Sequence, residues 1–204
     1  MPYINKACAD VAAFAASNGM RPILGTVYVT ETHCVATDSF RLLEVENPAV
    51  DPNEMPVLTT GGSMVPTPGS GLIPLSAIAK ASANSSKSKV LPILENIAVQ
   101  FDGATATLTT TDLENTDVVS TRVVEGNFPD YQQIMPKEAP TFRFAVNAKY
   151  LKEMAAYFQK HTNDKSSKVI LEFSDPTKPL IMRAIVGNNQ KAVGIIMPLR
   201  IDQA

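Results

Sequence analysis

The sequence lacks the residues and patterns that mark several classes of protein. It has no tryptophan, only 2 cysteines and 2 histidines among 204 residues, and no metal-ligand spacing around Cys8 or Cys34. No apolar run reaches the ~20 residues that span a bilayer. The N-terminus also lacks a basic start followed by a long apolar core. We therefore expect a cytoplasmic protein with buried free thiols, no disulfide framework and no membrane segment.

Signatures of catalysis are missing as well. His33 and Cys34 are adjacent, so in a strand their side chains point to opposite faces and cannot form a nucleophile–base pair. His161 has no partner nearby in the sequence, and no glycine-rich phosphate loop or metal motif occurs. We expect no catalytic residue, no metal and no cofactor. An α+β enzyme with a site assembled from distant carboxylates is the alternative that remains.

Charge is sparse and nearly balanced. Charged residues make up 19% of the chain, and 18 basic against 20 acidic residues give a net charge of −2. No overall basic field attracts nucleic acid, so any contact with DNA must come from locally clustered cations. The hydrophobic content of 45% is ordinary for a globular protein of one or two domains.

What the sequence does contain is a repeated unit. Apolar residues at helical spacing predict three helices, at residues 4–17, 73–83 and 147–160. Each helix is followed by about three alternating strands, which lie at 168–173, 179–186 and 192–200 in the third unit. Pro22-Ile23-Leu24 recurs as Pro92-Ile93-Leu94, and Thr37-Asp38 recurs as Thr111-Asp112. Asp102-Gly103 is a hairpin signal in the second unit.

This repetition predicts the domain organisation. Strands joined by hairpins pair antiparallel, and a helix can cover one face of each sheet, so the fold class is α+β. Residues 1–127 form one domain of two halves, 1–48 and 71–127, joined by a Pro-, Gly-, Ser- and Thr-rich connection at 49–70 that we expect to be exposed. Residues 128–141 are a linker, and 142–204 form a further half-domain.

Three separated segments carry a resemblance to a known family. They are Ala36-Thr37-Asp38-Ser39-Phe40-Arg41-Leu42, Phe128-Pro129-Asp130-Tyr131 and Ile196-Met197-Pro198-Leu199-Arg200. In this order they resemble the bacterial DNA polymerase III beta subunit, the sliding clamp that acts as a processivity factor in DNA replication. The resemblance implies a DNA-clamp-like fold of three repeated helix-plus-antiparallel-strand half-domains. Units one and two resemble the family's middle domain, and unit three resembles the second half of its last domain.

The resemblance also implies a shortened form. The family's first domain and the first half of its last domain have no counterpart here, and these carry the family's dimer contact. The resemblance therefore leaves open an open monomer or dimer, or a closed ring of four chains.

By the same resemblance, a partner peptide docks in an apolar cleft. The residues expected to form the cleft are Leu24, Thr37, Ser39, Phe40, Arg41, Leu42, Pro129, Ile134, Asn147, Tyr150, Ile195, Ile196, Met197, Pro198, Leu199 and Arg200. Methionine adapts to varied apolar side chains, and arginine can hold a carbonyl or carboxylate. A plainer reading remains open, in which Leu42, Ile195 and Ile196 are strand core and Arg41 is a surface ion pair.

Lysines on or near the predicted helices are candidates for contact with DNA phosphates. They are Lys80, Lys87, Lys89, Lys149, Lys152 and Lys160. Such contacts are independent of DNA sequence and sensitive to salt, and a solvated helix face is the alternative.

The implied partners are double-stranded DNA, a DNA polymerase or repair protein with a clamp-binding motif, a clamp loader and further copies of this chain. The main function hypothesis is a non-catalytic processivity factor. The alternative is a peptide-binding adaptor or decoy that does not encircle DNA.

Overall fold

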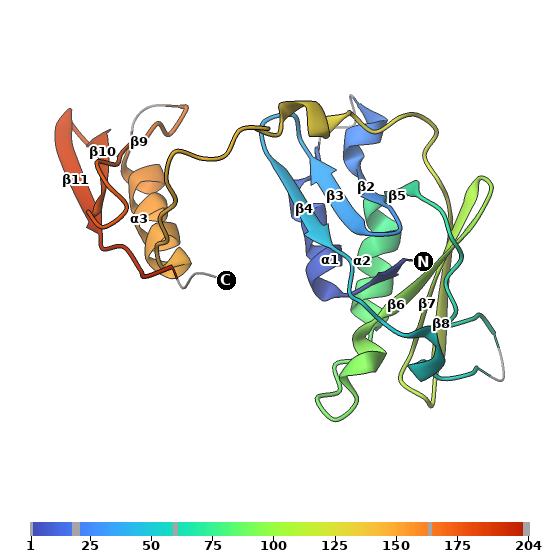
Figure 1. The fold of residues 1–204 in the computed structure, drawn as a ribbon. Coiled ribbons are helices and arrows are strands. Elements are labelled where there is room, and N and C mark those ends of the chain that lie inside the picture. The colour runs from blue at the N-terminus through green and yellow to red at the C-terminus, as the bar shows by residue number, and fades with distance from the viewer. Residues whose placement is uncertain (1, 18–20, 59–60, 163–164, 202–204) are drawn as a thin grey trace. The chain divides into compact units, whose positions relative to one another are not determined.

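The computed structural model describes residues 2–17, 21–58, 61–162 and 165–201. The chain divides into two compact units, Met1–Asp130 and Tyr131–Ala204, and each unit is described here by itself (Figure 1). The fold is α+β with antiparallel sheets, as the sequence predicts.

Unit 1 contains two sets of elements in the same order, a short strand, a helix, a 3₁₀ turn and three strands. The first set is β1 (Tyr3–Ile4), α1 (Lys6–Asp10) with a 3₁₀ extension (Val11–Phe14), a 3₁₀ turn (Pro22–Gly25), β2 (Thr26–Val29), β3 (His33–Thr37) and β4 (Leu42–Glu46). The second set is β5 (Gly71–Pro74), α2 (Leu75–Asn84), a 3₁₀ turn (Pro92–Glu95), β6 (Ile97–Asp102), β7 (Thr105–Thr111) and β8 (Thr116–Arg122). The recurring Pro-Ile-Leu thus forms the same turn in both sets.

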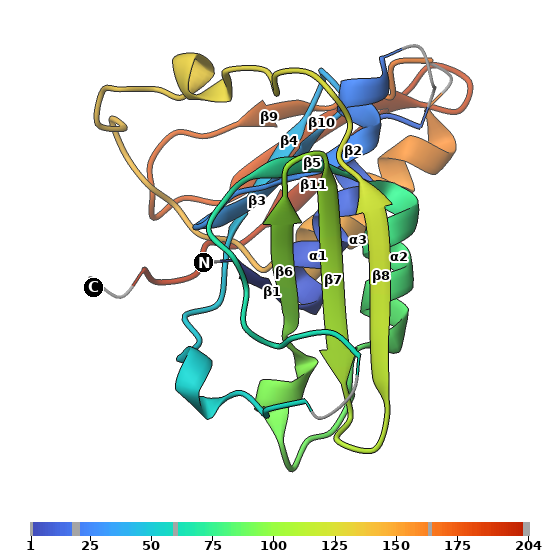
Figure 2. The same ribbon diagram turned by 90° about the vertical axis from the view of Figure 1, so that its right-hand side faces the viewer.

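The two sets exchange their first strands. The sheets have the orders β4-β3-β2-β5 and β1-β6-β7-β8, so β1 pairs with the second set and β5 with the first. Figure 2 shows β6, β7 and β8 side by side, with α2 along one face. Side chains from both sheets and both helices meet in one core, which includes Ile4, Val27, Ile78 and Leu108.

Two expectations for unit 1 were wrong in detail. The helix predicted at residues 4–17 is shorter, because Tyr3 and Ile4 are taken into a sheet and the Asn5 side chain caps α1 by accepting from Cys8 N at 3.1 Å. The connection at 49–70 is not exposed throughout, because Met55 and Met64 are buried against Tyr3 and Ala98. The Tyr3 hydroxyl donates to the Met64 carbonyl at 2.7 Å, so this segment covers the sheet face that points away from the helices.

Unit 2 begins with a 3₁₀ turn (Tyr131–Ile134) and continues with α3 (Ala148–His161), β9 (Ile170–Glu172), β10 (Leu180–Val186) and β11 (Gln190–Ile196). The sheet order is β11-β10-β9, and α3 covers one face. Phe158 from the helix packs with Met182, Ala184 and Ile196 from the strands. The strand predicted at 192–200 ends earlier, at Ile196, before Pro198.

Candidate peptide-binding groove

A groove of about 570 Å³ lies in unit 2, between α3 and the end of β11 with the residues that follow it. We call it the α3–β11 groove. Its lining residues are Asn147, Tyr150, Glu153, Met154, Tyr157, Ile195, Ile196, Met197, Pro198 and Leu199. Seven of the residues expected in the cleft are among them.

Local sequence explains how the walls are held. Asn147 caps α3 by accepting from Lys149 N at 2.9 Å, which starts the helix so that Tyr150, Met154 and Tyr157 follow one another along one side. A Cβ atom at position 194 would lie 2.8 Å from the Met154 sulfur. The glycine there lets the helix side chain rest on β11.

The segment after β11 forms the opposite wall. Pro198 cannot donate a ladder hydrogen bond, so it favours the end of the strand. Leu199 N then donates to Ala145 O at 2.7 Å, which ties the end of this wall to the segment before α3.

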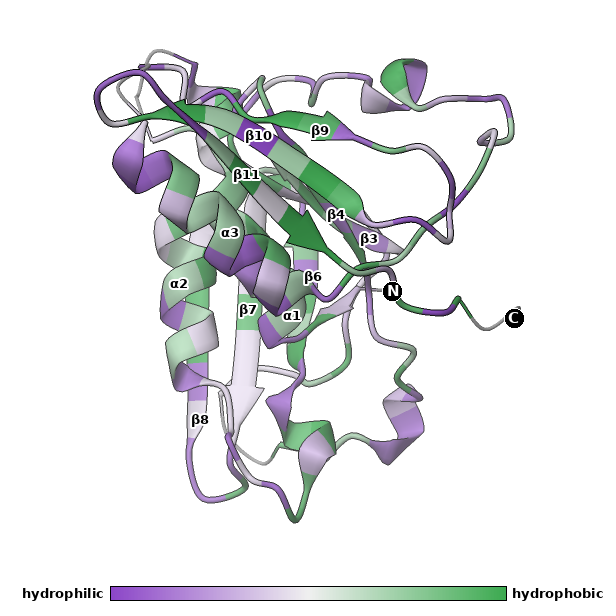
Figure 3. Ribbon diagram, turned by 90° about the vertical axis from the view of Figure 1, so that its left-hand side faces the viewer, coloured by the Kyte–Doolittle hydropathy of each residue, from purple (hydrophilic) through white to green (hydrophobic). Residues whose placement is uncertain are grey.

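The groove surface is apolar and accessible. Its exposed fractions are 55% for Tyr150, 50% for Tyr157, 58% for Ile195, 66% for Met197 and 53% for Leu199. Clustered exposed apolar side chains of this kind mark binding surfaces more often than isolated ones do. Figure 3 shows the hydrophobic colour at the end of β11.

Polar groups lie at the rim. Glu153 is 4.0 Å from the Lys149 ammonium group. The tyrosine hydroxyls add groups that can donate or accept. The arrangement can bind apolar side chains and orient a peptide backbone.

Some residues do not match the expectation. Ile196 is only 3% exposed and belongs to the core of unit 2, so it supports the floor, as the plainer reading of this residue has it. Arg200 lines a separate, smaller hollow beside Arg143 and Phe144. Ile134 is 76% exposed and is not among the lining residues.

Sequence reasoning missed Glu153, Met154 and Tyr157. The signal was present, because Tyr157 lies seven residues after Tyr150 and therefore on the same side of the helix.

The other expected cleft residues lie in unit 1, most of them around the turn between β3 and β4. The Asp38 carboxylate accepts from Phe40 N at 2.9 Å and Arg41 N at 3.0 Å, and the Thr37 hydroxyl donates to Arg41 O at 2.8 Å. Hydrogen bonds from Phe40 N, the Arg41 guanidinium and Arg41 N hold the pKa of Asp38 below its ordinary value. Ser39 adopts a positive φ of 76°.

The same turn recurs between β7 and β8. Thr111 donates to Asn115 O at 2.8 Å, Asp112 accepts from Glu114 N and Asn115 N, and Leu113 has a φ of 80°. The repeated Thr-Asp pair therefore encodes a repeated backbone conformation. The copies differ in what they present to solvent.

Phe40 and Arg41 are the distinctive side chains of the first copy. Phe40 is 96% exposed. The Arg41 guanidinium bonds Asp38 at 2.9 Å and the Ala13 carbonyl at 3.3 Å, and it lies 5.0 Å from the Phe14 ring centroid. Within unit 1, Arg41 is thus a surface ion pair, as the plainer reading has it.

The remaining cleft residues of unit 1 vary in exposure. Leu24 is 5% exposed and Thr37 8%, so they support the surface rather than form it. Leu42 is half-buried at the start of β4, and Pro129 is exposed near the end of the unit.

The candidate DNA-contact lysines are all exposed. Lys80 lies on α2, Lys87 and Lys89 follow it, and Lys149, Lys152 and Lys160 lie on α3. The ion pair with Glu153 reduces the charge that Lys149 presents to solvent.

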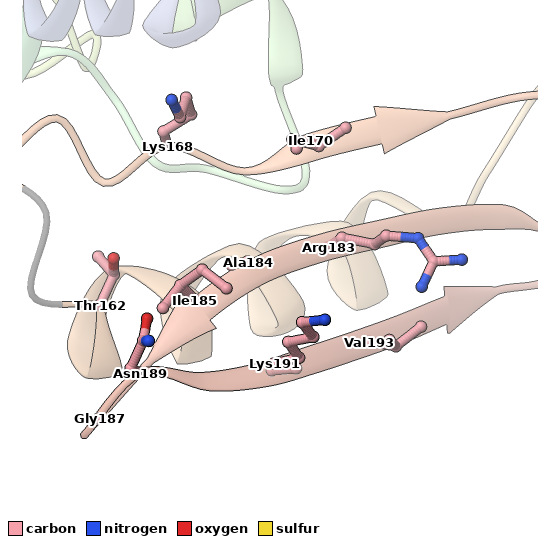
Figure 4. A pocket seen from close by; sticks show the side chains of 11 residues that line it. Thr162, Lys168, Ile170, Arg183, Ala184, Ile185, Gly187, Asn189, Lys191 and Val193 are labelled. Carbon is pink, nitrogen blue, oxygen red and sulfur yellow. The ribbon is translucent and has the colours of Figure 1, made fainter.

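A second hollow in unit 2, of about 590 Å³, lies on the sheet face opposite α3 (Figure 4). Lys168, Arg183 and Lys191 surround it together with apolar side chains such as Ile185 and Val193. Arg183 is paired with Glu172 at 2.9 Å. The alternation along β10 and β11 places these side chains away from the helix.

The cysteines form no site of their own in the part of the chain that the structure describes. Cys8 and Cys34 are free and buried, as expected, and the Cys34 thiol donates to the Asn47 side chain at 3.2 Å. In the described ranges, no three His, Cys, Asp or Glu side chains gather closely enough to hold a metal ion. No helix within those ranges has the length and apolar content needed to cross a membrane.

Comparison of sequences gives no match, either to a family model or to a curated protein. Comparison of structures does. A DNA polymerase III beta chain from Streptococcus pneumoniae matches with a TM-score of 0.66 at 19% identity, over 97% of this chain and 49% of that one.

Two further solved structures give the same result. The Caulobacter crescentus beta sliding clamp matches with a TM-score of 0.68 at 15% identity, over 97% and 50% of the two chains. The Thermotoga maritima beta subunit matches with a TM-score of 0.65 at 19% identity, over 96% and 49%. The chain spans about half the length of these proteins. Over nearly all of its own length, it has the fold of the bacterial DNA polymerase III beta subunit, the sliding clamp.

Proposed function

We propose that this protein is a non-catalytic clamp-like tether that holds a DNA polymerase or repair partner through a short apolar peptide of that partner. The observation that carries the proposal is the α3–β11 groove. Residues singled out from separate sequence segments line one apolar hollow, large enough for two or three side chains of a peptide.

The comparisons support this function indirectly. The structure of the Caulobacter crescentus clamp has polyethylene glycol at a region named for beta-motif tethering. A Pseudomonas aeruginosa clamp is described as bound to griselimycin. Proteins of this fold therefore bind ligands, and the proposal assigns the corresponding contact of this chain to the α3–β11 groove.

Contact with double-stranded DNA is the second part of the proposal. Exposed lysines on α2 and α3 can neutralise phosphates without reading sequence. A clamp loader and further copies of the chain are the additional partners that such a role calls for. Retention on circular but not linear DNA tests it, because a ring slides off a free end.

An adaptor that binds peptides without encircling DNA is the second candidate. Two observations favour it. The net charge of the chain is −2, which does not attract DNA. Two lysines are also paired with carboxylates, Lys149 with Glu153 and Lys6 with Asp10 at 3.0 Å. The adaptor predicts peptide binding together with no retention on DNA of either form.

The direct test is titration of a fluorescent peptide with adjacent Leu and Phe side chains, followed by anisotropy. Binding by the wild type, and weaker binding by Met197→Ala, supports the proposal. Absence of binding at protein concentrations of several hundred micromolar contradicts both the tether and the adaptor.

A further inference from the structure

Unit 1 shows how two sets of these elements complete each other. β5, the strand before α2, pairs with β2, and β1, the strand before α1, pairs with β6. The paired strands are closed off from water, since Val27, Val29 and Ile73 are each 0% exposed. Each set thus covers the sheet edge of the other.

Unit 2 repeats one of these sets in its described residues, down to individual hydrogen bonds. Leu72 lies three residues before α2, and Val124 N donates to Leu72 O at 2.9 Å. Ala145 lies three residues before α3, and Leu199 N donates to Ala145 O at 2.7 Å. Residues 144–146 therefore occupy the position that β5 has in unit 1.

The edges that are paired in unit 1 are open in unit 2. β9 is the first strand after its helix, as β2 and β6 are, and it lies at the edge of the sheet β11-β10-β9. Within the described part of unit 2, residues 144–146 do not pair with it. Ile170 is 54% exposed and Leu171 is 47% exposed, and an apolar open edge is a template for another strand.

In the part of unit 2 that the structure describes, its helix α3 also lacks the neighbouring helix that each helix of unit 1 has. In unit 1 α1 and α2 contact each other, and residues four, five and eight places after each N-cap line the hollow along this contact. They are Ala9 and Asp10 on α1, Ala13 on its 3₁₀ extension, and Ile78, Ala79 and Ser82 on α2.

The matching positions on α3, counted from its N-cap Asn147, are Leu151, Lys152 and Ala155. Ala155 is exposed and small enough for another helix to approach closely. Lys152 has a long aliphatic stem that can lie across a neighbour while its charge stays in water.

We propose that two copies of the chain associate through unit 2. Residues 144–146 of each copy pair with β9 of the other, and the two α3 helices pack through Leu151 and Ala155. A second copy fits because the exchange in unit 1 is reciprocal, and reciprocal exchange between identical partners is what a two-fold axis provides. The product is a complete two-sheet domain like unit 1.

This proposal does not depend on the proposed function. Tyr150 and Tyr157 lie three and ten places after the N-cap, about 100–160° around α3 from Leu151 and Ala155. The α3–β11 groove therefore stays open in the dimer. Loss of one surface by mutation leaves the other to be measured separately.

The test is the solution mass of the full chain by light scattering across a concentration series. The wild type is expected at twice the 21.9 kDa of one chain. Ala155→Glu places a carboxylate in the helix contact, and Leu171→Lys places an ammonium group on the paired strand. Each should weaken the dimer at least about tenfold, because a charge without a partner is buried. Glutamate is a good helix former, and circular dichroism checks that both variants are folded.

Tyr157→Glu is the matched control, because it alters the groove side of the same helix. It should leave the dimer intact while it abolishes peptide binding. A wild type that stays monomeric at about 100 µM overturns the proposal. A dimer that neither Ala155→Glu nor Leu171→Lys weakens also overturns it. Protection of the β9 amides from hydrogen exchange should rise with protein concentration, and constant exchange contradicts the strand pairing.

Discussion

Replacing Met197 with alanine tests whether the groove binds through buried apolar surface. Met197 is 66% exposed in the free protein. Complete burial of a methionine side chain is worth about 1.5–3 kcal/mol, so covering the remaining two thirds is worth about 1–2 kcal/mol. Since about 1.4 kcal/mol is a factor of ten in an equilibrium constant, we expect Met197→Ala to bind the Leu-Phe peptide roughly 5- to 30-fold more weakly.

Anisotropy titrations of the two proteins with the same peptide measure this ratio. Thermal unfolding should change little, because an exposed substitution alters stability by about 0.5 kcal/mol or less. Ile185→Ala is the matched control, since Ile185 is 49% exposed on the opposite face of the sheet. The reasoning is refuted if Met197→Ala binds as tightly as the wild type, or if Ile185→Ala has the larger effect.

Three further predictions concern stability and titration. Ile196→Ala should lower the free energy of unfolding of unit 2 by about 2–5 kcal/mol in urea titrations, because Ile196 is 3% exposed in its core; a loss below about 1 kcal/mol would place it outside the core. Tyr3→Phe should cost about 1–3 kcal/mol, because the Met64 carbonyl loses its buried donor, and faster proteolysis between residues 49 and 70 should accompany it. Asp38 should titrate below 3.8 in carboxylate NMR. Because the pKa is lower in the folded state, the Asp38 carboxylate stabilises the fold at pH values above its unfolded-state pKa, and this stabilisation is lost as the pH falls through the folded-state pKa. A titration midpoint above 3.8 would contradict the turn geometry.

The repeated motifs predicted a repeated unit, and the structure adds that they form repeated turns. Thr37-Asp38 and Thr111-Asp112 form the same hydrogen-bonded conformation, because threonine and aspartate side chains bond to backbone groups a few residues away. Periodicity gave the three helices and the three strands that follow each of them. The resemblance pointed to the residues after β11 that form one wall of the groove, but it did not point to Glu153 and Tyr157 on α3.

Two features could not be read from local sequence. β1 contains two residues and β5 is Gly71–Pro74, both too short to show an alternating pattern, and their pairing depends on strands far away in the chain. Met55 and Met64 lie in a segment whose composition indicates an exposed loop. Their burial depends on a sheet face that a local reading of the chain does not reveal.

The exchange of first strands in unit 1 also constrains how the chain acquires its structure during synthesis. Tyr3 pairs with Ala98 and Tyr28 pairs with Leu72, so neither sheet can be completed until most of the unit has left the ribosome. Contacts of such long sequence separation slow folding. The strand edges of the first set therefore stay unpaired until the second set has been synthesised. We expect unit 1 to fold in a single cooperative step rather than half by half.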